Sequence, residues 1–157
     1  MYPRTIAIVV ILMSLAACNN NQEDNGTVTF NKDSSDRTVK LSKHDRRFLD
    51  LQDSAQSQLH QFLDSFRIKS TDNDYEFLVK SAFSDSGLTE HMWSYVYDIN
   101  GNNFEAILGN EPFTVQNIIE GDSVIIKSTA IEDWMIIDHK REKKYGHFSQ
   151  EYLKSLE

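Results

Sequence analysis

Residues 92–108 read MWSYVYDINGNNFEAIL, and this stretch decides the fold of the chain. Met92 to Ile99 is rich in aromatic and β-branched residues, which predicts a strand. Asn100-Gly101 tolerates the positive φ angles of a type I′ turn, and Asn103 to Leu108 alternates as a second strand would. The stretch therefore predicts an antiparallel hairpin. One face of its first strand is expected to carry Trp93, Tyr95, Tyr97 and Ile99.

Further strands are predicted on both sides of this hairpin. Runs rich in Val, Ile, Tyr and Phe predict strands at 75–84, 123–127 and 134–138. Pro112 ends strand pairing, so we expect residues 113–119 to form a single helical turn or an irregular segment. The charged run at 139–144 is interpreted as a solvated loop, with contact to anionic headgroups or cell-wall phosphates as the alternative.

Helical periodicity dominates the region before the strands. Ser42 and Asp45 form a plausible capping box, and the apolar residues that follow are spaced by three and four positions. This pattern predicts one amphipathic helix of about 22 to 24 residues. Ser149 is expected to cap a second, short helix at the C-terminus. The apolar stripe of the long helix consists of Phe48, Leu51, Ala55, Leu59, Phe62, Leu63 and Phe66.

The order of these elements defines the fold class. A helix followed by consecutive strands, without alternating βαβ units, indicates an α+β domain. We expect one long N-terminal amphipathic helix packed on a curled antiparallel sheet of about five strands, with a short C-terminal helix.

The N-terminus has the pattern of a cleaved export signal. Arg4 provides a positive charge, Ile6 to Ala17 is apolar, and Leu15-Ala16-Ala17-Cys18 matches a lipobox. The apolar stretch is too short for a stable transmembrane helix, which needs about 20 residues. We expect residues 1–17 to be removed and Cys18 to carry palmitate or similar acyl chains. The alternatives are an ordinary secretory signal with a chance cysteine, or a short buried helix.

The remaining chain divides into a tether and a domain. Residues 18–41 are rich in Asn, Asp and Ser and poor in apolar residues, which predicts a flexible tether behind the lipid. Residues 42–157 form the predicted α+β domain, and their oligomeric state is left open. The tether and lipid would hold this domain at a membrane surface.

The charge balance limits the possible partners. With 16 Lys and Arg against 24 Asp and Glu, the net charge is −8, which argues against nucleic acid as a partner. We therefore expect the Cys18 lipid, rather than surface charge, to mediate membrane contact in the bacterial cell envelope. Asn19 favours the outer membrane over the inner membrane.

Two sets of residues are candidates for a functional site. If His91 faces Asp133, a carboxylate-oriented imidazole is available as a general base, and Glu90 is the other candidate partner. Trp93 and Trp134 could form a ligand-binding cleft with His91 and Asp133 at its rim. The simpler alternatives are that His91 hydrogen bonds a backbone carbonyl and that both tryptophans are core residues.

No motif for a metal or cofactor is present. The five histidines lack the four-residue spacing of zinc proteases, and the chain has no glycine-rich phosphate loop. Cys18 is the single cysteine, so none is left for catalysis. We therefore expect neither a cofactor nor a bound metal.

Several short elements between Tyr75 and Phe148 resemble the YegJ-like family of small bacterial proteins, a family that implies no reaction. The chain departs from the family at Gly109, where the family's glycine is expected at the position of Ala106, and in the basic loop at 139–145. The matching elements are Glu90-His91-Met92-Trp93, Asn110-Glu111-Pro112, Gly121-Asp122, Ile131-Glu132-Asp133-Trp134 and Gly146.

These observations predict a membrane-anchored lipoprotein with a non-enzymatic binding or interaction domain. Its partner would be an envelope protein or a small ligand. The alternative is an envelope hydrolase or cell-wall-modifying enzyme that uses His91 with Asp133 or Glu90. The two hypotheses differ in whether His91 and a carboxylate lie within hydrogen-bond reach.

Overall fold

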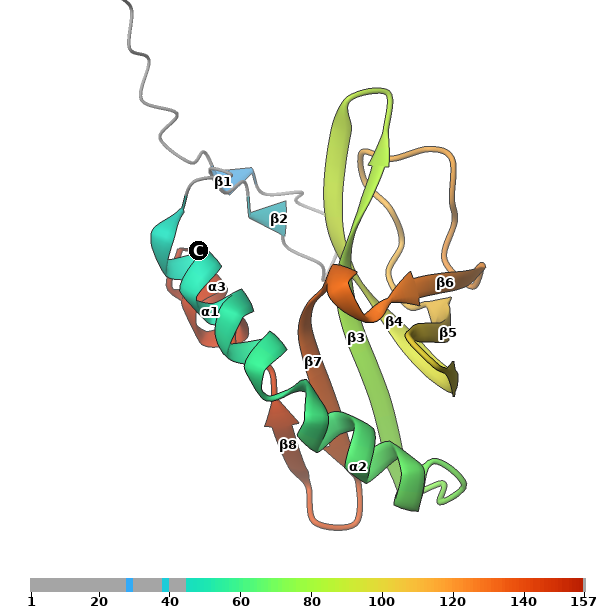
Figure 1. The fold of residues 1–157 in the computed structure, drawn as a ribbon. Helices are drawn as coiled ribbons and strands as arrows, with labels where there is room; N and C mark the ends of the chain where they lie inside the picture. The colour runs from blue at the N-terminus through green and yellow to red at the C-terminus, as the bar shows by residue number, and fades with distance from the viewer. Residues whose placement is uncertain (1–27, 30–37, 40–44, 157) are drawn as a thin grey trace, which may run out of the picture.

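The computed structural model describes residues 28–29, 38–39 and 45–156, which form an α+β fold (Figure 1). Six antiparallel strands make one open sheet in the order β6-β5-β4-β3-β7-β8. The elements are β1 (Val28–Thr29), β2 (Thr38–Val39), α1 (Arg46–Ser57), α2 (Leu59–Lys69), β3 (Tyr75–Asp85), β4 (Leu88–Asn100), β5 (Asn103–Leu108), β6 (Ser123–Lys127), the 3₁₀ turn Ser128–Ala130, β7 (Ile131–Asp138), β8 (Lys143–Gly146) and α3 (Gln150–Ser155).

The central hairpin is confirmed. Strands β4 and β5 pair from Asn100 opposite Asn103, and Gly101 adopts a φ of 59° in the turn between them. The α+β class and the antiparallel sheet are also confirmed, with six strands rather than about five. The additional strand is β8, which lies partly within the charged run that was expected to be a loop.

The prediction of one long helix is wrong, because Gln58 interrupts the helical region and divides it into α1 and α2. Gln58 has φ −104° and ψ 5°, and its amide is directed to the carbonyls of Ala55, at 3.3 Å, and Gln56. Asp45, rather than Ser42, caps α1, because its side chain accepts a hydrogen bond from the amide of Phe48. The break lets α1 follow β7 while α2 turns to cover the sheet (Figure 1).

The core lies between the helices and one face of the sheet. Phe62 of α2 is fully buried at its centre, and its ring contacts Phe77, Phe104 and Trp134 at centroid distances of 5.5 to 6.0 Å. A second, smaller cluster joins Met92, Leu108 and Val115. Val115 belongs to the 113–119 segment, which is irregular in the structure, as one of the two expected alternatives.

A bulge in β4 changes the predicted face of this strand. Pairing with β5 shifts register between Val96 and Asp98, so one extra residue is accommodated there. Trp93, Tyr95 and Tyr97 point away from the helices, whereas Ile99 packs against the core. The expectation that Ile99 shares a face with the three aromatic residues is therefore wrong.

The C-terminal helix α3 is present, but its expected cap is not. The hydroxyl of Ser149 donates a 2.7 Å hydrogen bond to Asp133 instead of capping the helix backbone. This contact attaches the chain before α3 to β7 and leads directly to the candidate site.

Candidate functional site

His91 pairs with a carboxylate, but not with either of the expected ones. Its Nδ1 lies 2.6 Å from Oε2 of Glu132, and the two side chains are 41% and 17% exposed. The ring also makes an edge contact with Phe48 of α1, at a centroid distance of 6.1 Å. The partner of the imidazole is thus the Glu132 carboxylate, which replaces the predicted partners Asp133 and Glu90.

Glu90 is engaged in holding a loop. Its carboxylate accepts hydrogen bonds from the amides of Phe113, Thr114 and Val115 and from the Thr114 hydroxyl, at 2.9 to 3.4 Å. Burial disfavours the charged carboxylate, yet these donors outweigh it and the pKa of Glu90 is lowered. A carboxylate stabilised in this way is a poor acid–base partner for His91.

Asp133 is also occupied by structural contacts. It is almost fully buried and accepts hydrogen bonds from the amides of Trp134, Phe148 and Ser149 and from the Ser149 hydroxyl, at 2.7 to 3.0 Å. These donors satisfy its acceptor positions. Asp133 therefore fastens the C-terminal segment to β7, and the predicted catalytic role lacks a geometric basis.

The two tryptophans do not form a common cleft. Trp134 is 2% exposed in the core, where its indole N–H donates a 2.9 Å hydrogen bond to the Ala55 carbonyl. Trp93 lies two strands away and points to the opposite face of the sheet. The core alternative thus describes Trp134, while Trp93, partly exposed, is still a candidate for ligand contact.

Lys80 is the residue that sequence reasoning missed. It lies on β3 between Trp93 and Asp133 in the strand register, and only 8% of it is exposed. Its Nζ lies 5.7 Å from the centroid of the Trp93 ring. Among the side chains of residues 45–156 this ammonium has no hydrogen bond and no ion pair. A lysine inside the largely apolar run of 77–83 was the available signal.

The negative charges near Lys80 belong to Asp133 and Glu132, which lie at a bulge in β7. Burial lowers the pKa of Lys80, and the negative charges of Asp133 and Glu132 oppose this shift without cancelling it. Lys80 is paired with Asp133 and Ser81 with Ile131, so Glu132 is the extra residue of the bulge. Glu132 consequently acts on two residues: it contacts the His91 imidazole, and its negative charge favours the protonated form of Lys80.

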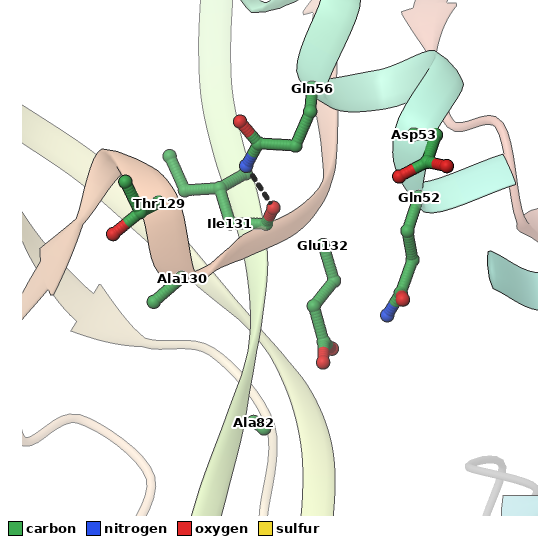
Figure 2. A pocket seen from close by; sticks show the side chains of 8 residues that line it. All are labelled: Gln52, Asp53, Gln56, Ala82, Thr129, Ala130, Ile131 and Glu132. Carbon is green, nitrogen blue, oxygen red and sulfur yellow. Dashed lines mark hydrogen bonds between the residues drawn. The ribbon is translucent and has the colours of Figure 1, made fainter. Parts of the chain in front are cut away.

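A hollow of about 360 Å³ adjoins this cluster, between α1 and the start of β7 (Figure 2). Gln56 is one of the residues that line it, and its side-chain amide donates to the carbonyls of Ser128 and Ile131. In Figure 2 the carboxylate of Glu132 extends away from the Gln56 contact. The lining residues are Gln52, Asp53, Gln56, Ala82, Thr129, Ala130, Ile131 and Glu132.

Lipidation of Cys18 and the flexible tether stay predictions. Cys18 and the tether, apart from β1 and β2, lie outside the described residues. Within the described part of the chain, no helix is long and apolar enough to cross a membrane. The same residues contain no group of three His, Cys, Asp or Glu side chains suited to a metal ion.

The fold and site define a small α+β domain, with a histidine–carboxylate pair beside a buried lysine. The chain belongs to the family described as "Uncharacterized protein conserved in bacteria (DUF2314)", which matches residues 45–156. It is 30% identical to "Uncharacterized protein YegJ" of Escherichia coli (strain K12) over 95 residues, covering 60% of this chain and 59% of that protein. No solved structure matches. The predicted family resemblance is therefore confirmed.

Proposed function

We propose that this protein is a lipid-anchored binding module of the bacterial envelope, with a ligand site formed by Lys80, Trp93, His91 and Glu132. The observation that carries this proposal is Lys80, which is only 8% exposed, lies against the ring of Trp93 and has no side-chain hydrogen bond or ion pair with any other residue of 45–156. A buried ion costs several kcal/mol unless it is paired and hydrogen bonded. An ionisable group kept in such a setting is a candidate for ligand contact.

The chemistry of the four side chains suits a small zwitterion, such as an amino acid or the end of a peptide. A ligand carboxylate would give Lys80 the hydrogen-bonded counter-ion that the described residues do not provide. A ligand ammonium would complement Glu132, which has one carboxylate oxygen directed to His91. The ring of Trp93 supplies an apolar wall.

The occupied carboxylates argue against an enzyme that uses His91 with Asp133 or Glu90. Asp133 and Glu90 are each saturated by donors from the backbone and a hydroxyl. The His91–Glu132 contact of 2.6 Å is the one observation that favours a general base. A hydrolase hypothesis therefore runs through Glu132, and turnover abolished by both His91→Ala and Glu132→Gln, with folding intact, would establish it instead.

Binding is tested by following tryptophan fluorescence of the detergent-solubilised protein during titration with glycine, alanine and glutamate. We expect a saturable change that Trp93→Phe removes, because Trp134 lies in the core and reports little. Lys80→Met should abolish binding, whereas Lys127→Met, at an exposed lysine of β6, should leave it unchanged. No saturable response to any of these zwitterions, or equal effects of both lysine variants, would refute the ligand site.

Anchoring is proposed from the lipobox and is tested separately. Cys18→Ser should move the protein from the membrane fraction to the soluble fraction, because acyl chains supply the membrane affinity. Separation of the two membranes would then show whether the lipidated protein reaches the outer membrane, as Asn19 suggests. Retention of the Cys18→Ser variant in membranes would contradict anchoring by lipid.

A further inference from the structure

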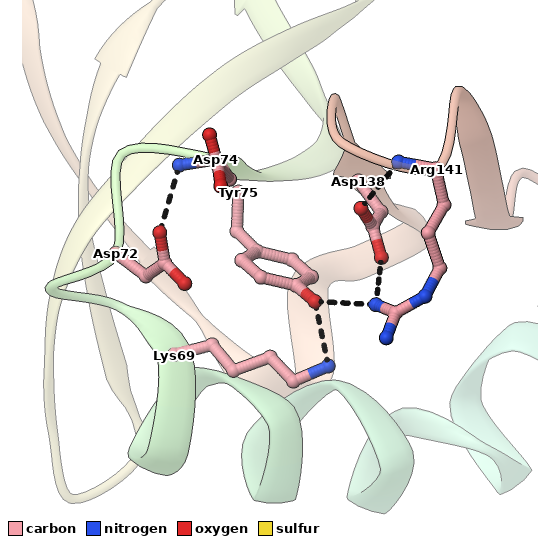
Figure 3. Close-up of polar contacts among 6 residues, drawn as sticks. All are labelled: Lys69, Asp72, Asp74, Tyr75, Asp138 and Arg141. Atoms are coloured by element: carbon pink, nitrogen blue, oxygen red, sulfur yellow. Dashed lines mark hydrogen bonds and ion pairs between the residues drawn. The ribbon is translucent and has the colours of Figure 1, made fainter.

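A second polar cluster lies at the far end of the domain from the start of α1, where α2 ends and β7 turns into β8 (Figures 1 and 3). Its centre is the hydroxyl oxygen of Tyr75, which lies 3.2 Å from Nζ of Lys69 and 3.0 Å from a guanidinium nitrogen of Arg141. Both cations can only donate, so the phenol oxygen accepts from both of them. Two positive charges thus converge on one neutral atom.

Among residues 45–156, only one of these two cations, Arg141, is paired directly with a carboxylate. Asp138 is fully buried and accepts a 2.8 Å hydrogen bond from the Arg141 side chain and a 2.9 Å hydrogen bond from the Arg141 amide. Within residues 45–156 the Lys69 ammonium has no carboxylate partner, and its polar contacts are the oxygen and the ring of Tyr75. The three charged groups therefore leave one positive charge uncompensated within the cluster.

The neighbouring acids do not supply the missing partner. Asp72 accepts a hydrogen bond from the amide of Asp74, and neither aspartate forms an ion pair with Lys69 or Arg141 in the described region (Figure 3). Glu76 is paired with His139, at 2.9 Å. Among the residues that the structure describes, Lys69 and Arg141 thus keep donors available on their outer side.

The cluster is also fixed in position and open to solvent. The Arg141 side chain is 59% exposed, yet the buried carboxylate of Asp138 orients its guanidinium. Arg141 contacts Asp138 and Tyr75 through a single guanidinium nitrogen, which leaves the rest of the fork for a ligand. A tetrahedral group with several acceptor oxygens can satisfy this fork and an ammonium together.

We infer that Lys69, Tyr75 and Arg141 form a binding site for a phosphate group. The phosphate could belong to a lipid headgroup or to a free phosphate ester, because both present the same acceptor oxygens. This site is separate from Lys80 and does not depend on the ligand proposed there. The basic run at 139–144 was considered above for contact with anionic headgroups or cell-wall phosphates. The site assigns such contact to Arg141, which is the member of that run in the cluster, whereas His139 is paired with Glu76.

The test measures phosphate binding to the full chain solubilised in detergent, with inorganic phosphate and glycerol phosphate as probes in calorimetry. We expect Lys69→Met and Arg141→Gln to weaken binding by about two- to fivefold each, because each removes one charged donor. Lys140→Gln is the matched control, since Lys140 is exposed and adjacent to Arg141 but outside the cluster. Lys69 makes no hydrogen bond to the buried Asp138, so Lys69→Met keeps the Asp138–Arg141 contact. Loss of binding in this variant is therefore not explained by loss of that structural contact.

A second arm distinguishes the two sources of phosphate. The Cys18→Ser protein is mixed with phosphatidylglycerol vesicles and with phosphatidylcholine vesicles, and co-flotation is measured. Flotation with phosphatidylglycerol that is lost in Lys69→Met identifies a lipid headgroup, whereas binding of glycerol phosphate without flotation identifies a free ester. Absence of binding to every probe, or an equal loss in Lys140→Gln, overturns the inference.

Discussion

The hydroxyl of Tyr152 donates a 2.6 Å hydrogen bond to Oδ2 of Asp45, which joins the C-terminal helix to the start of α1. The other carboxylate oxygen of Asp45 accepts from the amide of Phe48 and caps α1. One side chain therefore performs two tasks at the point where the N-terminal segment enters the domain. This arrangement makes the two ends of the domain depend on each other.

Removal of this contact should produce a pH-dependent loss of stability. The Tyr152 hydrogen bond is the largest of the effects that lower the pKa of Asp45 below its ordinary value of 3.8. A lowered pKa stabilises the fold above the ordinary value, and this contribution is lost as pH falls through the folded-state pKa. Urea unfolding should show Tyr152→Phe to be less stable than the parent at pH 7, with the difference vanishing at acid pH. A constant difference across this range would exclude the linkage.

Glu90→Gln should loosen the 113–115 loop without unfolding the sheet. The amide side chain keeps one acceptor oxygen but loses the charge that four donors share, at a cost of about 1 kcal/mol. Hydrogen exchange should accelerate at the amides of Phe113, Thr114 and Val115 while β5 keeps its protection. Gln116→Ala is a suitable control, because its contact to Asp85 uses the backbone amide.

Asp133→Asn should destabilise the fold by about 2 to 4 kcal/mol. An asparagine has one acceptor oxygen where Asp133 has two, so its N–H₂ group faces buried donors such as the amide and hydroxyl of Ser149 in place of an acceptor. Unsatisfied buried donors are costly. The midpoint of urea unfolding measures this effect. Asp53→Asn, on the exposed face of α1, should shift the midpoint little. A neutral Asp133→Asn would show that the C-terminal segment is not held in this way.

The strands were predictable because their signals are local. The local pattern gives the bounds of β5 and β6 and, with the Asn100-Gly101 turn, the end of β4, although β4 begins at Leu88, four residues before its predicted start. The break at Gln58 was not predictable, since the apolar spacing continues from Ala55 to Leu59 across it. Strand β8 was missed because Lys143 and Lys144 are typical of a protected sheet edge, where charge replaces alternation.

The site was harder to predict because it depends on strand register. His91 meets Glu132 rather than Asp133 because the bulge in β7 inserts one residue opposite Lys80 and Ser81. A bulge leaves no clear mark in a single sequence, so the adjacent carboxylates could not be told apart. The approach of Lys80 to Trp93 likewise requires the pairing of β3 with β4.

Gly146 should be intolerant of any side chain, in contrast to Gly101. Both glycines have positive φ angles, of 79° and 59°, so alanine at either position should cost about 1 kcal/mol from backbone strain. A Cβ on Gly101 would meet nothing within 4 Å. A Cβ on Gly146 would lie 2.5 and 2.6 Å from ring carbons of Trp134 and would also clash with its backbone carbonyl, neither of which can move without disturbing the core. Overpacking should raise the cost of Gly146→Ala to about 3 kcal/mol or more. Thermal unfolding of the two variants measures the difference, and equal losses would mean that β8 can move away from Trp134.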